Sequence, residues 1–146
     1  MPSTVSTRDA SPTDAPALAA LLAHLGYPVD PADLPARMER FVGVGNGRVL
    51  VATLCGDIVG FAAIDLTYPI HHPVPVMHIS AFAVAPAARR KGVGRALLAA
   101  IEAASRENGC RRMVVTSAEP CADAHQFYQA EGWKYTGRRF NRDVAP

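Results

Sequence analysis

A run of basic residues and glycines in the second half of the chain has the composition of an anion-binding loop. It covers residues 89–95 and reads Arg-Arg-Lys-Gly-Val-Gly-Arg. Gly92 and Gly94 lack Cβ atoms where a helix is expected to begin, so backbone N–H groups there can face a ligand. The positive end of the helix dipole and the flanking cations favour a phosphate or pyrophosphate. A solvated basic turn, with glycines that serve packing, is the alternative interpretation.

The distribution of charge along the chain favours the interpretation of this loop as an anion site. The chain has 15 basic and 13 acidic residues, a net charge of +2 with neutral histidines. Four of the basic residues fall in the loop, namely Arg89, Arg90, Lys91 and Arg95, which leaves 11 basic against 13 acidic residues elsewhere. A compact basic patch suits one small polyanion, whereas a nucleic-acid interface usually has an extended basic footprint. We therefore expect no nucleic-acid partner.

Length and composition indicate a single domain over residues 1–146. At 146 residues and 49% hydrophobic content, the chain can bury a core and is excluded from the disordered polyelectrolytes. No apolar run approaches the roughly 18 residues that span a bilayer, so no membrane partner is expected. Residues 1–12 are polar and lack the apolar core of a signal peptide.

The cysteines favour a reducing compartment. Cys55, Cys110 and Cys121 are an odd number without C-x-x-C spacing, which suits thiols in a cytoplasm. Cys110, Cys121 and His125 have the spacing C-x10-C-x3-H, which matches no zinc pattern. We therefore expect a cytoplasmic protein without a metal.

The pattern of apolar residues predicts alternating strands and helices with a mostly antiparallel first half. Strands are expected over residues 5–8, 48–54, 58–66, 77–85 and 112–116, with a last hairpin over 133–140. Helices are expected around residues 18–25, 31–41, 93–104 and 123–131. The chain is thus predicted to be an α/β protein.

Two motifs resemble the GCN5-related N-acetyltransferase (GNAT) family. Arg89-x-x-Gly92-x-Gly94 resembles its [QR]-x-x-G-x-[GA] signature, and residues 124–133, AHQFYQAEGW, are similar to its A-x-x-F-Y-x-x-x-G-[FW] stretch. The resemblance is specific over about residues 79–133. It implies the GNAT acyl-CoA N-acyltransferase fold: a mixed central sheet of about six to seven strands with about four helices, splayed between the fourth and fifth strands.

The same resemblance implies where acetyl-CoA binds. Backbone groups of Phe82, Ala83 and Val84 would pair with the pantetheine arm, and the Val84 N–H would polarise the thioester carbonyl. The pyrophosphate would lie on the amides of residues 90–95. The other residues implied to bind the cofactor are Arg89, Arg90, Lys91, Gly92, Val93, Gly94, Arg95, Cys121 and Tyr128. Relatives commonly have Asn or Arg at the position of Cys121, so one cofactor contact differs here.

Tyr128 matches the tyrosine of the family's F-Y pair and is the candidate general acid that protonates the departing CoA thiolate. Packing among aromatic residues is the alternative role for it. The general base is less defined, because relatives often carry acidic residues at the positions of Ser80 and Ala81. His78, on the same predicted strand, has a suitable chemistry for a base.

Other sources of a base remain open. His78 could simply be exposed or hydrogen-bonded, and a chain of water molecules could remove the amine proton. His71 and His72, in a proline-rich loop before the strand, could border the acceptor pocket or be exposed.

The resemblance predicts an acetyl-CoA-dependent N-acetyltransferase that acts on a primary amine of a small molecule. The amine would attack the thioester directly in a ternary complex, where proximity supplies much of the rate enhancement. An acetyltransferase of proteins or peptides and a non-catalytic CoA-binding sensor are the alternatives. The family resemblance also suggests a homodimer.

Overall fold

A computed structural model describes residues 4–116 and 122–145 of the chain. The chain forms two compact units, one that extends to Val114 and one that begins at Val115. In the described part of the chain, no helix is both long enough and apolar enough to cross a membrane.

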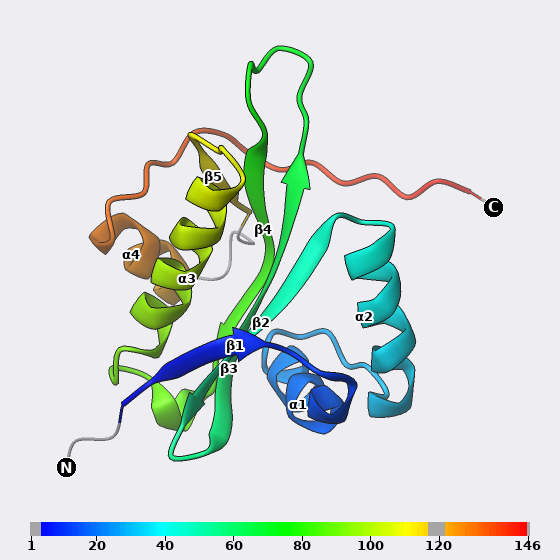
Figure 1. The fold of residues 1–146 in the computed structure, drawn as a ribbon, viewed down its shortest axis with the longest axis vertical. Helices are drawn as coiled ribbons and strands as arrows, with labels where there is room; N and C mark the ends of the chain where they lie inside the picture. Colours follow the sequence, from blue (N-terminus) through cyan, green and yellow to red (C-terminus); the bar gives the residue numbers. More distant parts are fainter. Residues whose placement is uncertain (1–3, 117–121, 146) are drawn as a thin grey trace. The chain divides into compact units, whose positions relative to one another are not determined.

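The first unit is built on a twisted sheet (Figure 1). Its strands follow one another in space in the order β1-β2-β3-β4-β5. They are β1 (Ser6–Asp9), β2 (Gly47–Leu54), β3 (Asp57–Thr67), β4 (Val76–Val84) and β5 (Met113–Val115). The first four pair antiparallel, and β5 follows β4 through a helical crossover of the kind that parallel neighbours require. The predicted mixed α/β fold is confirmed, with five strands in the described residues where six to seven were expected.

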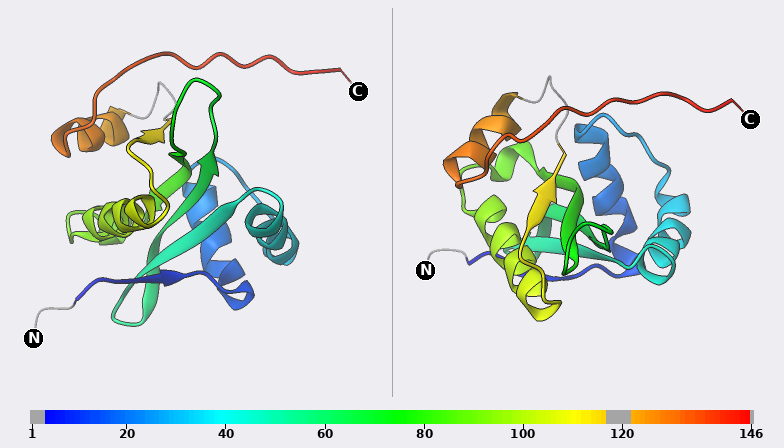
Figure 2. Two further views of the ribbon diagram at one scale, coloured as in Figure 1. Left: turned by 45° about the horizontal axis from the view of Figure 1, so that its top comes forward. Right: turned by 90° about the horizontal axis from the view of Figure 1, so that it is seen from above.

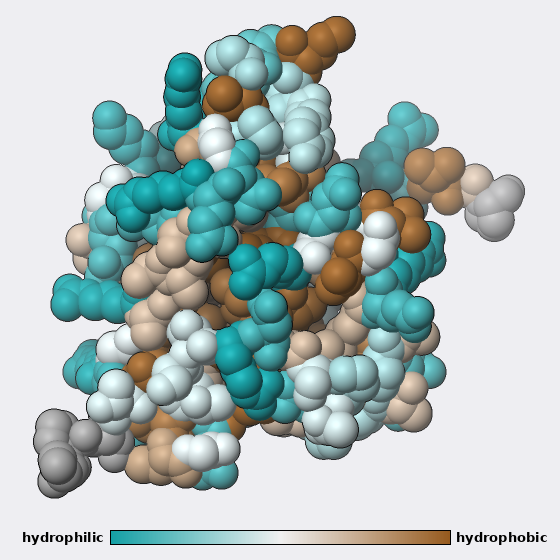
Figure 3. Space-filling view, in the orientation of Figure 1, coloured by the Kyte–Doolittle hydropathy of each residue, from teal (hydrophilic) through white to brown (hydrophobic). Residues whose placement is uncertain are grey.

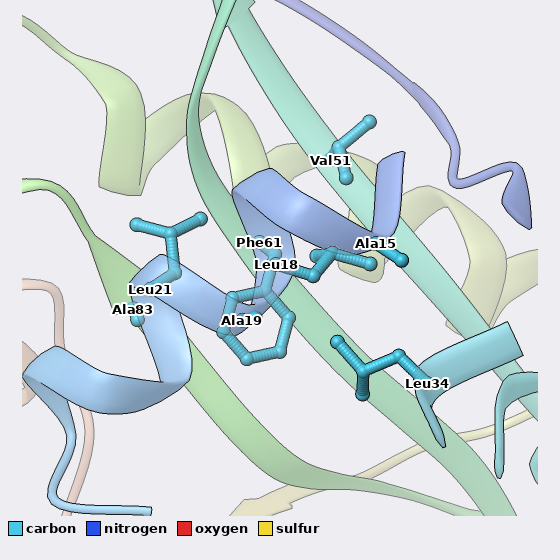
Figure 4. Close-up of a cluster of buried hydrophobic side chains, with 8 residues drawn as sticks. All are labelled: Ala15, Leu18, Ala19, Leu21, Leu34, Val51, Phe61 and Ala83. Atoms are coloured by element: carbon cyan, nitrogen blue, oxygen red, sulfur yellow. The ribbon is translucent and has the colours of Figure 1, made fainter. Parts of the chain in front are cut away.

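Helices cover both faces of this sheet. Figure 2 shows α1 (Ala15–His24) and α2 (Leu34–Gly43) on one face and α3 (Val93–Glu107) on the other. The apolar spacing along α1 turns its leucines toward the sheet, where Leu18 and Leu21 are buried against Phe61 and Ala83 (Figure 4). On the opposite face, Leu97 and Ile101 of α3 are fully buried.

Gly60 allows α3 to approach the sheet closely. A Cβ atom at this position would lie 2.9 Å from Val93 Cγ1 and 3.1 Å from the main-chain oxygen of Ala83. Both distances are shorter than ordinary carbon contacts, so a side chain here would push the helix away. Gly60 therefore holds the beginning of α3, and the loop before it, against β3 and β4.

An ion pair joins β1 to the beginning of α1. The Arg8 guanidinium donates to both carboxylate oxygens of Asp14, at 2.7 and 3.0 Å, and the Ser11 N–H donates to the same carboxylate at 2.7 Å. These bonds, the one from Arg8 above all, lower the pKa of Asp14 to about 2. The pair lies on the edge of the unit and fixes the entry of the chain into the first helix.

The second unit contains α4 (Ala122–Ala130) and the C-terminal segment. The helix ends before Gly132, which has φ +89°. The Trp133 N–H donates to the main-chain oxygen of Tyr128 at 2.9 Å and closes the last turn. The hairpin predicted over residues 133–140 is wrong, because residues 133–145 form neither helix nor strand. Tyr135 and Phe140 are exposed there, so the alternation of apolar residues has no sheet to pack against.

Candidate active site

An irregularity in β4 determines which side chains this strand presents. Ala63 of β3 pairs with Ala81, but the next residue, Ile64, pairs with Ile79, so Ser80 is an extra residue in β4. Such a bulge reverses the alternation of side chains beyond it. His78 therefore points to the same face as Ala81, the face that α1 and α2 cover.

The bulge brings His78 opposite a carboxylate. His78 pairs in register with Asp65 of β3, and His78 Nδ1 lies 3.1 Å from Asp65 Oδ1. An ionised carboxylate only accepts hydrogen bonds, so Nδ1 carries the proton and the lone pair of the neutral ring is on Nε2. Both side chains are partly shielded from solvent, with 34% of His78 and 18% of Asp65 exposed. The pair thus has the arrangement of an oriented imidazole base.

Near the end of β4, every second backbone N–H group points away from β3. The Ala85 N–H donates to the Val59 oxygen of β3 at 2.7 Å. Because successive N–H groups of a strand point to opposite sides, those of Val84 and Phe82 point to the other edge of β4. Ala83, between them, pairs with Phe61 of β3. The strand β5 begins beside the start of β4, where the Met77 N–H donates to the Arg112 oxygen at 3.0 Å.

The loop before α3 has an unusual backbone. Arg90 and Gly92 are both left-handed, at φ +63° and +81°, with Lys91 between them. Alternating backbone conformations of this kind turn successive N–H groups into one concave surface that suits an anion. The Ala96 N–H donates to the Gly92 oxygen at 3.0 Å, so the hydrogen bonds of the helix begin there. The N–H groups of Val93 and Gly94 come before Ala96, the first N–H donor of the helical pattern, and can therefore face the same surface.

The side chains of this loop divide into two groups. The four cations predicted to meet the pyrophosphate are exposed, namely Arg89, Arg90, Lys91 and Arg95. The Val93 side chain is buried under the sheet, so this residue offers a ligand its backbone alone. The loop thus combines outward positive charge with an anchored helix start.

A pocket of about 330 Å³ lies at the other end of β4, below the loop that joins β3 to β4. Its lining includes His71, His72, His78, Arg112, Val76 and Val114. The Thr67 hydroxyl donates to the Val76 oxygen at 3.3 Å and closes the base of the loop. The tip of the loop carries exposed apolar surface, visible at the top of Figure 3, and Ile70 is fully exposed.

Comparison with known proteins identifies the family of this chain. The model of the acetyltransferase (GNAT) family matches residues 15–133. The chain belongs to the GNAT family. It is 34% identical over 135 residues to an aminoglycoside N(6')-acetyltransferase type 1 of Stenotrophomonas maltophilia, which covers 90% of this chain and 87% of the relative. It is 30% identical over 97 residues to an aminoalkylphosphonate N-acetyltransferase of Salmonella typhimurium, 66% of this chain and 63% of that one.

Solved structures show the same fold. An aminoglycoside N-acetyltransferase, AAC(6')-Iy in complex with CoA, superposes with a TM-score of 0.82 at 23% identity, over 98% of this chain and 97% of that chain. The GNAT fold predicted from the two motifs is therefore confirmed. The family and the activity shared by both relatives identify this GNAT protein as an N-acetyltransferase.

Two predicted site residues belong to the second unit. Tyr128 is buried in α4, and its ring centroid lies 5.6 Å from that of Phe127 and 5.6 Å from that of Trp133. Its aromatic neighbours fit the packing role, and its part in catalysis stays a prediction. Cys121 lies outside the described residues.

Sequence reasoning missed Asp65 and Arg112. Asp65 is the single charged residue within the apolar run 58–66, which was a signal for a special role. Its partnership with His78 depends on the bulge at Ser80, which no sequence pattern announces. The sequence pattern predicts Arg112 only as the first residue of a strand, yet its guanidinium NH1 lies 3.0 Å from His72 Nε2.

Proposed function

We propose that this GNAT protein transfers the acetyl group of acetyl-CoA to a primary amine of a small molecule by direct attack in a ternary complex. The observation that carries the proposal is the arrangement of β4. One strand presents an oriented histidine near its start and outward N–H groups near its end, and it then leads into a basic loop with left-handed residues at Arg90 and Gly92.

The loop fits the pyrophosphate of CoA. Its N–H groups, from residue 90 to residue 95, would hold the phosphates, and the cations Arg89, Arg90, Lys91 and Arg95 would supply the counter-charge. Gly92 permits the left-handed turn, and the buried Val93 holds the loop against the sheet. Cys121 is proposed to line the same cofactor site.

The end of β4 would hold the acyl arm. When bound, acetyl-CoA supplies the acetyl thioester. The Val84 N–H, which points away from β3, would donate to the thioester carbonyl as negative charge develops, and Phe82 would bind the pantetheine. Ala83 pairs with Phe61 of β3, and this pairing would fix the positions of Phe82 and Val84.

His78 is the proposed general base. Asp65 fixes its ring, so Nε2 can accept a proton from an ammonium group or from a water molecule beside it. Tyr128 is the proposed general acid for the CoA thiolate, a role supported by its place in the F-Y motif. Both proton transfers use side chains of the protein, and no step of the scheme requires a metal.

The pocket beside His78 is the proposed acceptor site. Its volume of about 330 Å³ is at the small end of ligand pockets, which favours a small amine over a protein segment. The two relatives are named for two chemically different small amines, an aminoglycoside and an aminoalkylphosphonate.

Three broader properties complete the proposal. The two units together would act as one acetyltransferase domain, residues 1–146, because the family model spans both. A homodimer is proposed, since Tyr135 and Phe140 leave apolar surface exposed in the C-terminal segment. The odd number of cysteines supports a cytoplasmic location.

The test combines calorimetric titration with acetyl-CoA and an assay of CoA thiol release with a panel of small amines. We expect binding, amine-dependent release, and a roughly 10-fold weaker affinity when Arg89→Gln and Arg90→Gln are combined. Arg37→Gln, an exposed arginine of α2, is the matched control. Binding without release from any amine would favour a CoA sensor, and release with a lysine peptide alone would favour a peptide acetyltransferase.

A further inference from the structure

The pocket beside His78 is lined by an arginine and histidines, and this charge indicates which class of amine it would accept. Building on the proposed function, we infer that the acceptor amine also bears an anionic group, a carboxylate or a phosphonate, which Arg112 binds. The amine and the anionic group would then lie on one small molecule, between His78 and Arg112.

Arg112 is held in place at the pocket. Its main-chain oxygen accepts from the Met77 N–H at 3.0 Å, and its guanidinium NH1 lies 3.0 Å from His72 Nε2. Arginine has five N–H donors and no acceptor, so His72 accepts this bond in its neutral form. One donor thus orients the guanidinium. Its remaining N–H groups form a planar fork that matches carboxylate and phosphonate oxygens.

The pocket has no acidic side chain in its described lining. Arg112 is the charged group there, beside the three histidines His71, His72 and His78. The nearby carboxylate of Asp65 is already bonded to His78. An acceptor with several positive charges would be repelled by Arg112, and no acidic side chain of the described lining would offset that repulsion. An anionic group would instead form charge-assisted hydrogen bonds with Arg112.

The two ends of the site are close along the sheet. The residue after Met77 is His78, and the Met77 N–H donates to the main-chain oxygen of Arg112, the residue just before β5. Main chains joined by such a hydrogen bond lie about 5 Å apart, so a base and an anion-binding group at these positions suit a short molecule. An amine separated from its anionic group by one or two carbons meets this requirement.

The experiment compares acceptors of matched size by the kcat/KM of CoA thiol release. The size-matched probes are 2-aminoethylphosphonate, β-alanine and ethanolamine, which lacks an anionic group, and the larger polycationic tobramycin is added as a contrast. We expect the two anionic amines to be preferred over ethanolamine at least 10-fold. Arg112→Gln should reduce that ratio toward one, and Arg111→Gln, its exposed neighbour outside the pocket lining, should keep it. An unchanged ratio in Arg112→Gln, or a preference for tobramycin, overturns the inference.

Binding of methylphosphonate to the wild-type protein, followed by NMR, provides a measurement that needs no turnover. We expect saturable binding that competes with the anionic amines and that Arg111→Gln retains. Lack of saturable binding overturns the inference even if amines without an anionic group are acetylated. Absence of thiol release with every amine refutes the proposed transferase activity instead, and methylphosphonate binding then decides the inference independently.

Discussion

Asp65 and His78 face each other across β3 and β4, with Asp65 Oδ1 3.1 Å from His78 Nδ1. The contact exists because Ser80 is an extra residue in β4 and reverses the side-chain alternation of the strand before it. A carboxylate that holds one nitrogen of an imidazole leaves the other available as a proton acceptor. The bulge is therefore the feature that converts an ordinary strand histidine into a candidate base.

Removal of this base should lower turnover far more than it lowers cofactor binding. We expect His78→Gln to reduce kcat about 100-fold and Asp65→Asn about 10-fold, because a general base contributes roughly 10²–10⁴-fold. Steady-state kinetics and acetyl-CoA titration separate the two effects. Asp57→Asn, an exposed carboxylate at the start of β3, is the matched control. Unchanged kcat in both variants would assign proton removal to water.

Tyr128→Phe tests the proposed general acid. The substitution keeps the ring and its packing against Phe127 and Trp133 but removes the hydroxyl. We expect kcat to fall at least 10-fold, with acetyl-CoA affinity and melting temperature nearly unchanged. Tyr135→Phe, at an exposed tyrosine in the same unit, should leave all three quantities as they are. A fall in melting temperature at full kcat would make Tyr128 a packing residue.

The close approach at Gly60 predicts a stability effect. A Cβ atom there would lie 2.9 Å from Val93 Cγ1, so Gly60→Ala should lower the free energy of unfolding by about 1–3 kcal/mol. Gly43→Ala is the control, since an added Cβ there has no atom within 4 Å and the change should stay within about 1 kcal/mol. Urea unfolding of both variants measures the difference. Equal stability would mean that α3 shifts without cost.

The Arg8–Asp14 pair predicts a pH dependence of stability. The pKa of Asp14 is lowered from 3.8 to about 2 in the folded chain, so between these values the unfolded chain binds more protons. The contribution of Asp14 is therefore complete above about pH 5 and is lost as the pH falls toward 2. Since half of Arg8 is exposed, solvent screens the pair, and we expect Asp14→Asn to cost about 1–2 kcal/mol at neutral pH.

Urea unfolding of the wild type and of Asp14→Asn from pH 7 down to pH 2 checks this sign. The difference between them should shrink steadily below about pH 5. A difference that grows on acidification would contradict the role of Asp14, and Asp33→Asn, on the surface before α2, serves as the control.

Local patterns predicted the elements with strong periodicity. The spacing of apolar residues from Val93 onward gave α3, and the β2–β3 hairpin followed from apolar runs on either side of Gly56. The prediction of a hairpin over residues 133–140 was wrong, because alternating apolar residues form a stable hairpin only when another surface packs against them. The site could be predicted only where one segment contains it, as in residues 89–95. Asp65 and Arg112 become site residues through pairing between strands, which local patterns do not specify.

Product analysis tests the central claim most directly. The wild-type protein and His78→Gln are incubated with acetyl-CoA and each amine of the panel, and mass spectrometry then measures the amine and the intact protein. We predict one N-acetylated amine for each CoA thiol released, a protein of unchanged mass, and strongly reduced product with His78→Gln. An acetylated protein without acetylated amine, or thiol release that does not depend on any amine, would contradict direct transfer.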